Sequence, residues 1–335
     1  MAKVDHISVL ATAPTGDSGP DSITVTGDDT WVAYTNGADS TGLSGSSTIV
    51  EYDRSGHIDQ TYQIAGSVDG LKVDPVTGEI WALQNQDGNS TLTLIDPQDH
   101  SLSNPLSYAV PSSARGYDDV AFEHGKVYLS YTNPVNNGDP TLVQLTNGND
   151  PIGTLNTNTI LAFGATGVNL ETGKTETIPQ NDPDSLKVAP NGDLLLSSGS
   201  DDTIIDVRDP GTAHQSVAFT QIQGVTGGLD DVIMPNAHAG TFYLSDTAHN
   251  RVLTVHASGL NLNDYYASVG NAFGQVDPNT GVFTALVTAA DAPGFQFGSA
   301  HGVSFVANNH DFAHPGDDCH GFGPHIASNL GPHRF

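Results

Sequence analysis

Apolar residues in this chain come in short bursts of four to seven, separated by polar residues and by turns rich in Gly, Pro, Asn and Asp. Bursts of this length between turn residues predict β-strands, because helices need longer segments with a 3.6-residue period. Five bursts are strongly apolar and typical of buried strands, at residues 31–34, 80–83, 127–130, 194–197 and 242–245.

A short motif recurs six times, in most copies just before one of these bursts. It consists of an acid (His in the last copy), a small or acidic residue, and an aliphatic residue. The acids and the His are Asp21, Asp69, Asp118, Asp184, Asp230 and His301. Successive copies are 48, 49, 66, 46 and 71 residues apart. A period near 50 residues with four short strands per unit predicts a β-propeller.

We therefore predict an all-β fold, a propeller over residues 1–307 with six blades of four antiparallel strands; five or seven blades stay open as alternatives. Residues 6–10 should supply the outer strand of the last blade and residues 302–307 its inner strand. Three explanations remain for its middle strands: the blade is thin, the 71-residue spacing contributes to it, or another chain supplies them. In the last case the protein self-associates by strand exchange.

The net charge of the chain limits the classes of partner that it can bind. The sequence has 38 acidic and 10 basic residues, a formal net charge of −28. A surface of this charge repels phosphate backbones, so nucleic acid is excluded as a partner. No apolar run approaches the ~20 residues of a membrane helix, and residues 1–13 lack the apolar core of a signal peptide. The Lys-poor, Asp-rich composition still favours an extracellular or periplasmic protein, and the single Cys319 excludes an intrachain disulfide.

The propeller geometry predicts where the repeated acids lie. The first strand of each blade lines the central axis, so Asp21, Asp69, Asp118, Asp184, Asp230 and His301 should converge at one end of it. Converging carboxylates repel one another, and a hard cation such as Ca²⁺ removes the conflict. The His also allows Zn, Mn or Fe. The alternative is that each Asp is a turn residue that hydrogen-bonds between blades and binds no ligand.

Other residues are predicted to support this site. Asp119 and Asp231, which follow the motif acid, are more consistent with hydrogen-bond acceptors between blades. Segments 134–158 and 257–271 are predicted insertions that overhang the axis as a partial lid. Four polar residues at the ends of second strands are candidates to orient a substrate: Asn36, Asn85, Asn133 and Asp246.

At these motifs the sequence resembles the six-bladed calcium propellers of the SMP-30/gluconolactonase/lactonase-like superfamily, and also NHL-type propellers. The best-matching copies are residues 68–71 and 300–303. The resemblance implies metal ligands at the motif position, usually a Glu from the first blade with Asn and Asp from later blades. Asp21 stands where the Glu would be, and Asp118, Asp184 and Asp230 stand where Asn or Asp would be. His301 resembles the metal-binding or base His of NHL-type lyases, but their other His positions are Asp here.

Two functions follow from these observations. The first is divalent-metal-dependent hydrolysis of a small lactone or ester, with Asp184 or His301 as the general base. The second is a non-catalytic secreted binding or assembly module that a metal ion stiffens. Residues 308–335 form a separate His-, Gly- and Pro-rich tail, in which a second transition-metal site is a further hypothesis. Its candidate ligands are His310, His314, Cys319, His320, His325 and His333.

Overall fold

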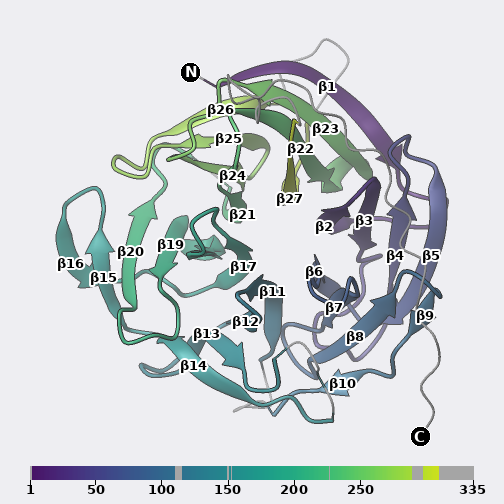
Figure 1. Ribbon diagram of the computed structural model, residues 1–335, viewed down its shortest axis with the longest axis horizontal. Helices are drawn as coiled ribbons and strands as arrows, with labels where there is room; N and C mark the ends of the chain where they lie inside the picture. The colour runs from purple at the N-terminus through teal and green to yellow at the C-terminus, as the bar shows by residue number, and fades with distance from the viewer. Residues whose placement is uncertain are drawn as a thin grey trace, which may run out of the picture.

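The computed structural model describes residues 2–109, 115–148, 151, 153–225, 227–288 and 297–308. Within these ranges the chain forms six β-sheets arranged as a ring (Figure 1). The predicted six-bladed, all-β propeller is therefore confirmed. The described residues include no helix long and apolar enough to cross a membrane. The tail with its proposed metal ligands lies outside the described residues, except for Asn308.

The first four blades follow the order of the chain. Blade one consists of β2 (Pro20–Thr26), β3 (Asp29–Tyr34), β4 (Ser46–Tyr52) and β5 (Ile58–Ala65). Blade two consists of β6 (Val68–Val73), β7 (Ile80–Gln84), β8 (Thr91–Asp96) and the short outer strands β9 (Ser101–Leu102) and β10 (Leu106–Ser107). Blade three consists of β11 (Tyr117–Glu123), β12 (Lys126–Tyr131), β13 (Pro140–Leu145) and β14 (Thr157–Ala162).

Blade four carries an additional hairpin on its outer edge. Its four main strands are β17 (Pro183–Val188), β18 (Leu194–Ser198), β19 (Thr203–Arg208) and β20 (Ser216–Gln221). The hairpin of β15 (Thr166–Asn169) and β16 (Lys174–Thr177) joins this sheet through a parallel pairing of β15 with β20. The hairpin therefore extends the outer edge of the blade, away from its inner strand β17.

Blades five and six are interleaved along the chain. Blade five consists of β21 (Leu229–Ile233), β24 (Tyr265–Val269), β25 (Ala272–Val276) and β26 (Phe283–Thr288). Blade six consists of β27 (Ala300–Ala307), β22 (Ala239–Asp246), β23 (Arg251–Ser258) and β1 (Lys3–Thr12). The chain thus leaves blade five after its inner strand, builds two strands of blade six, and then returns to complete blade five.

This strand order shows which residues complete the last blade, and it corrects one predicted strand assignment. The N-terminal strand closes the last blade, as predicted, by pairing antiparallel with β23. The 71-residue spacing supplies the two middle strands, which was one of the three explanations. Residues 242–245 were expected to be the second strand of the fifth unit, but β22 pairs with β27 in blade six instead. The last blade is complete within one chain, so strand exchange is not needed to fill it.

The second residue of each motif copy, which follows the acid or the His, makes the contact between neighbouring inner strands. Asp119 accepts a hydrogen bond from the backbone N–H of Leu186 at 2.9 Å, and Asp231 accepts one from Val303 at 2.7 Å. Both residues are therefore inter-blade acceptors, as predicted. At Gly70 a Cβ atom would clash with the backbone oxygen of Asp118, so Gly is required by the close approach.

The residue that follows the motif acid or His also links the blades in the other copies of the motif. Ser22 donates to the backbone oxygen of Asp69, and Ser185 donates to Asp231 Oδ1 at 2.7 Å. Gly302 closes the ring, because a Cβ there would clash with the backbone oxygen of Asp21 in blade one. These contacts hold the inner strands at a fixed spacing, which in turn fixes the positions of the motif acids.

Six hydrophobic clusters stabilise the ring, one between each pair of adjacent blades. The second strands contribute most strongly, since all the residues of β7, β12 from Val127 onward, and β18 are buried. Trp31 packs against Tyr62 beside blade two, and Phe242 packs against Phe273 across blades five and six at 4.9 Å between ring centroids. The core is therefore distributed between blades rather than concentrated at the axis.

Candidate functional site

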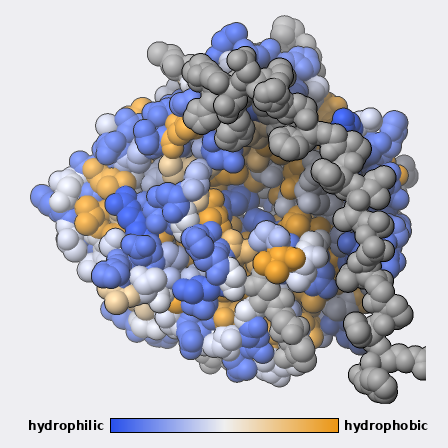
Figure 2. All heavy atoms as spheres, viewed as in Figure 1, coloured by the Kyte–Doolittle hydropathy of each residue, from blue (hydrophilic) through white to orange (hydrophobic). Residues whose placement is uncertain are grey.

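The six motif residues converge, as the propeller geometry predicts. All of them line one cavity of about 360 Å³ at the end of the axis where the inner strands begin. The six inner strands surround the centre of the ring in Figure 1, and the space-filling view from the same direction is hollowed there (Figure 2). These six lining residues are Asp21, Asp69, Asp118, Asp184, Asp230 and His301.

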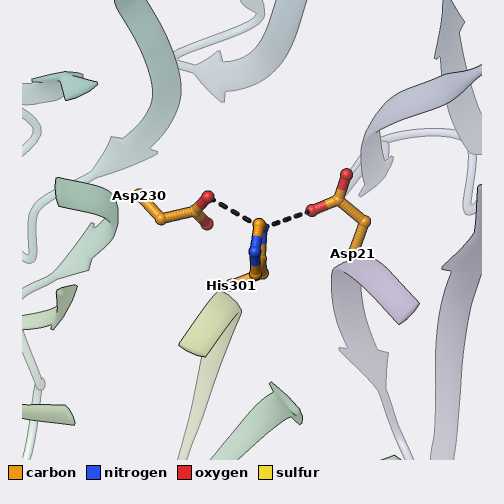
Figure 3. Close-up of side chains that lie close together, drawn as sticks. All are labelled: Asp21, Asp230 and His301. Carbon is orange, nitrogen blue, oxygen red and sulfur yellow. Dashed lines mark ion pairs between the residues drawn. The ribbon is translucent and has the colours of Figure 1, made fainter. Parts of the chain in front are cut away.

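His301 lies between two of the acids. Its Nδ1 is 2.9 Å from Asp230 Oδ1 and 3.2 Å from Asp21 Oδ1 (Figure 3). These residues come from the inner strands of three consecutive blades, five, six and one. One ligand atom from each of the three lies within 4.8 Å of the other two. The separation suits a single ion at about 2.0–2.5 Å from each ligand.

The carboxylates control the protonation of His301. Burial alone would lower its pKa, but the neighbouring Asp230 and Asp21 outweigh burial and raise the pKa to about 12. Without a metal ion, His301 is therefore an imidazolium that bridges two carboxylates. Metal binding at Nδ1 requires loss of that proton, so the proton and the ion compete for the same position.

The remaining acids interact with one another. Burial and the neighbouring carboxylates raise the pKa of Asp69, Asp118 and Asp184 well above the usual range. Asp69 and Asp118 also hydrogen-bond to each other through their side chains, which requires a shared proton.

Sequence reasoning missed several residues of this cavity. Asp182, Asp87 and Gln86 also line it. Asp182 lies two residues before the motif acid Asp184, and Gln86 and Asp87 lie two and three residues after the end of β7. Their closeness to these predicted elements could have identified them from the sequence. Of the four candidate substrate-orienting residues only Asn133 lines the cavity; Asp246 instead forms ion pairs with Arg251 and His249.

The predicted lid is wrong for the described residues. Segment 134–158 contains β13, and segment 257–271 contains β24, so both contribute strands to the blades. The short stretch Thr132–Asn133 reaches the cavity, where Asn133 donates to Asp87 Oδ1 at 2.7 Å. The two segments were interpreted as insertions because each follows a predicted second strand, and the strands within them were not recognised.

A second layer of charges lies further along the inner strands. Lys72 Nζ is 2.9 Å from Asp119 Oδ2, and Lys187 Nζ is 2.6 Å from Asp231 Oδ2. Burial opposes ionisation of Asp231, but Lys187 keeps the pKa of this carboxyl below its ordinary value. Both lysines are thus paired with Asp119 and Asp231 and not with the motif acids. Among the described residues lining the axial cavity there is no lysine or arginine to balance the motif acids.

The donor set fits a divalent metal ion. Two carboxylates and an imidazole are suitable ligands for Zn, Mn or Fe, whereas Ca²⁺ prefers oxygen ligands alone. Asp21, Asp230 and His301 would hold the ion, because only these three bring ligand atoms close enough among the described His, Cys, Asp and Glu residues. The oxygen-only side of the cavity, around Asp69 and Asp118, has the composition that Ca²⁺ prefers.

Comparison with known proteins supports the fold. No protein-family model matches the sequence, and no curated protein matches it. Among solved structures, a putative gluconolactonase is 12% identical with a TM-score of 0.51, covering 92% of each chain. A protein of unknown function from Bacteroides caccae is 10% identical with a TM-score of 0.51, covering 86% of this chain and 87% of its own.

A third solved structure is similar with a lower TM-score. The periplasmic gluconolactonase of Pseudomonas aeruginosa is 12% identical with a TM-score of 0.48, covering 86% of this chain and 88% of its own. At 10% and 12% identity, the two structures with a TM-score of 0.51 establish a shared fold and no more. The resemblance inferred from the motifs therefore holds at the level of the propeller architecture, which is the architecture of gluconolactonase-like proteins.

Proposed function

We propose that the axial cavity binds a divalent metal ion and hydrolyses a small lactone or ester. The observation that carries the proposal is the convergence of five aspartates and one histidine, from six separate blades, on a single open cavity of about 360 Å³. A cavity of this size is at the lower end of the range for small-molecule sites, about 300–1,000 Å³. The repeat brings these positions together, but it does not require acids there, and a cluster of carboxylates without a cation is costly.

The residues divide into a metal-binding group and a reacting group. Asp21, Asp230 and His301 would hold the ion at their three converging ligand atoms. When bound, a divalent ion would polarise the carbonyl oxygen of the substrate and lower the pKa of water. His301 then serves as a ligand, which leaves Asp184 as the candidate general base.

Asp184 has the properties of a general base. Burial, together with the negative charge of Asp230, raises the pKa of Asp184 well above the usual range for a carboxyl group. A carboxylate with a raised pKa accepts a proton from the attacking water more readily and returns it to the leaving alkoxide. The net reaction consumes one water and yields one carboxylic acid and one alcohol, which in a lactone remain in the same molecule.

Two polar side chains support substrate binding. Gln86 lines the cavity, and its Oε1 is buried without a hydrogen-bond partner in the described structure. Such an acceptor is costly to leave unpaired, so it favours a substrate that carries a hydroxyl donor. Asn133 lines the same cavity and offers a side-chain amide to the substrate. These residues favour a hydroxylated lactone over a plain hydrocarbon ester.

The experiment is a hydrolysis assay with hydroxylated γ- and δ-lactones and aryl esters, with the protein loaded in turn with Zn²⁺, Mn²⁺ and Ca²⁺. We expect turnover that a chelator abolishes and that Asp184→Asn lowers by about 100-fold or more. Asp53→Asn, in the turn between β4 and β5, is the matched control and should retain full activity. Turnover unchanged by Asp184→Asn would contradict the assignment. Metal binding without turnover of any substrate would favour a metal-stiffened, non-catalytic module.

A further inference from the structure

A second cavity of about 360 Å³ lies between blades four and five. It shares no lining residue with the axial cavity. Its walls come from the β17–β18 turn, the end of β19, the start of β24 and the β25–β26 turn. The polar side chains on these walls are Asn191, Asp193, Asp206, Arg208, Asn263, Tyr265 and Asn279.

This cavity lies at the opposite face of the propeller from the motif acids. Asp184 is near the start of β17, whereas Ala189 and Asn191, which line the second cavity, follow the end of that strand. At about 3.3 Å per residue, the extended strand separates Asp184 from Ala189 by roughly 16 Å. A molecule of monosaccharide size cannot occupy both cavities at once, so the second is a separate candidate site.

Asp206 provides an unsatisfied acceptor in this cavity. Its side chain is almost fully buried, with 6% of the residue exposed. Asp206 Oδ2 accepts from Arg208 Nε at 2.9 Å, but Asp206 Oδ1 has no hydrogen-bond partner in the described structure. A buried carboxylate oxygen without a donor costs free energy, so the site favours a ligand or a water that donates to it.

The charges on the walls exclude the simplest ionic ligands. Arg208 pairs with Asp206 and disfavours a metal cation, because its guanidinium already neutralises this carboxylate. Asp193 and Asp206 both line the cavity and disfavour an anion. Burial and the neighbouring Asp206 raise the pKa of Tyr265, so its hydroxyl remains a donor. The walls therefore suit a neutral ligand.

The hydrogen-bonding groups specify the kind of neutral ligand. Asn263 and Asn279 each offer both a donor and an acceptor, Arg208 offers donors, and Asp206 offers an acceptor. A hydroxyl group is itself both donor and acceptor, so adjacent hydroxyls match such a surface. We propose that the crevice between blades four and five binds a small, neutral, polyhydroxylated ligand of monosaccharide size. Asp206 accepts a hydrogen bond from one of its hydroxyls.

The experiment is calorimetric titration of the full chain with D-glucose, D-galactose, D-mannose and myo-inositol, and separately with Ca²⁺ and inorganic phosphate. We expect at least one polyol to bind in the millimolar range. Asp206→Asn should weaken this binding by about tenfold or more, because it removes the charged acceptor. Asn279→Ala, a substitution at an exposed position of the rim, should weaken binding while leaving the fold and any hydrolytic activity unchanged.

Asp184→Asn, in the axial cavity, separates the two sites. Polyol binding that persists in Asp184→Asn and weakens in both Asp206→Asn and Asn279→Ala supports the proposal. Three results would overturn it: no polyol binding to the wild-type protein, binding lost only in Asp184→Asn, or binding of Ca²⁺ or phosphate that Asp206→Asn abolishes. Because the readout is binding at a different face, the proposal does not depend on the proposed hydrolysis.

Discussion

The imidazole Nδ1 of His301 lies 2.9 Å from Oδ1 of Asp230, although the two residues are 71 positions apart in the chain. They occupy equivalent positions on the inner strands of adjacent blades, and β22 to β26 lie between them in sequence. The contact exists because each inner strand begins with the same motif and the ring brings those beginnings together. A site of this kind depends on closure of the whole propeller.

The acidic cavity should make the metal-free protein less stable as pH rises. The pKa values of Asp69, Asp118, Asp184 and His301 are raised in the folded state. Groups with raised pKa values stabilise the fold fully below their unfolded pKa, near 4 for Asp and 6.5 for His, and this contribution is lost as pH rises through the folded values. The thermal midpoint of chelated protein should therefore fall between about pH 5 and pH 9.

The matched variant for this measurement is Asp118→Asn. It keeps a side chain able to hydrogen-bond to Asp69 but removes one ionisable group, so the midpoint should decline less steeply with pH. Saturating divalent metal should also reduce the decline, because an ion compensates the charges that high pH creates. A midpoint of the chelated protein that rises over this interval would be inconsistent with buried, mutually repelling carboxyl groups.

The buried ion pair of Lys187 with Asp231 predicts a large loss of stability. Lys187→Met removes one partner and leaves a buried carboxylate 3% exposed without its cation. Breaking a buried pair in this way typically costs about 3–5 kcal/mol of the free energy of unfolding. Urea denaturation measures it, with Lys174→Met on the exposed strand β16 as the control, expected within about 0.5 kcal/mol of wild type. Equal effects of the two substitutions would contradict the importance of the buried pair.

Residues of the N-terminal strand that pack against a core cluster should contribute more to stability than its exposed residues. Ile7 packs against the cluster between blades five and six, whereas Val9 on the same strand is 42% exposed. Ile7→Lys should lower the free energy of unfolding by about 2 kcal/mol, from lost apolar burial, and Val9→Lys by less than about 0.5 kcal/mol. Chemical denaturation of both variants provides the comparison. The opposite order would contradict the packing of Ile7 against the cluster between blades five and six.

The interleaved order of blades five and six should make them one cooperative unit. Phe273 in blade five is fully buried and packs against Phe242 in blade six. Phe273→Ala should cost about 3–5 kcal/mol and accelerate amide exchange in β22 and β23 as well as in blade five. Val282→Ala, at a position 52% exposed, is the control. Acceleration confined to β24, β25 and β26 would show that the two blades open independently.

The repeat alone predicted the number of blades, the inner strands and the place where the motif residues meet. It succeeded because each inner strand must begin with a residue able to occupy the crowded axis, and the following residue, such as Asp119 or Asp231, must contact the next blade. Those requirements are local and leave a signature in the sequence. The inner-strand position of Gly70 has the same origin.

The assignment of the middle strands failed for an equally physical reason. The apolar pattern of residues 242–245 predicts a buried strand but does not say to which blade it belongs. A buried strand has the same apolar composition whichever neighbour it pairs with. Only the pairing of β22 with β27 places it in blade six, and that pairing leaves no local pattern. Similarly, Asp182 and Gln86 line the cavity because of where turns pass over the axis, which the strand pattern does not encode.

The most direct test of the central claim is a metal titration of chelated protein, read by calorimetry and by elemental analysis after dialysis. Zn²⁺, Mn²⁺ and Ca²⁺ are each titrated into wild type, Asp230→Asn, His301→Ala and the control Asp53→Asn. We predict one tightly bound ion per chain in wild type and in the control, with affinity reduced by about 100-fold or more in the two site variants. If none of the three ions binds stoichiometrically, or if both site variants bind as wild type does, the axial acids do not form a metal site.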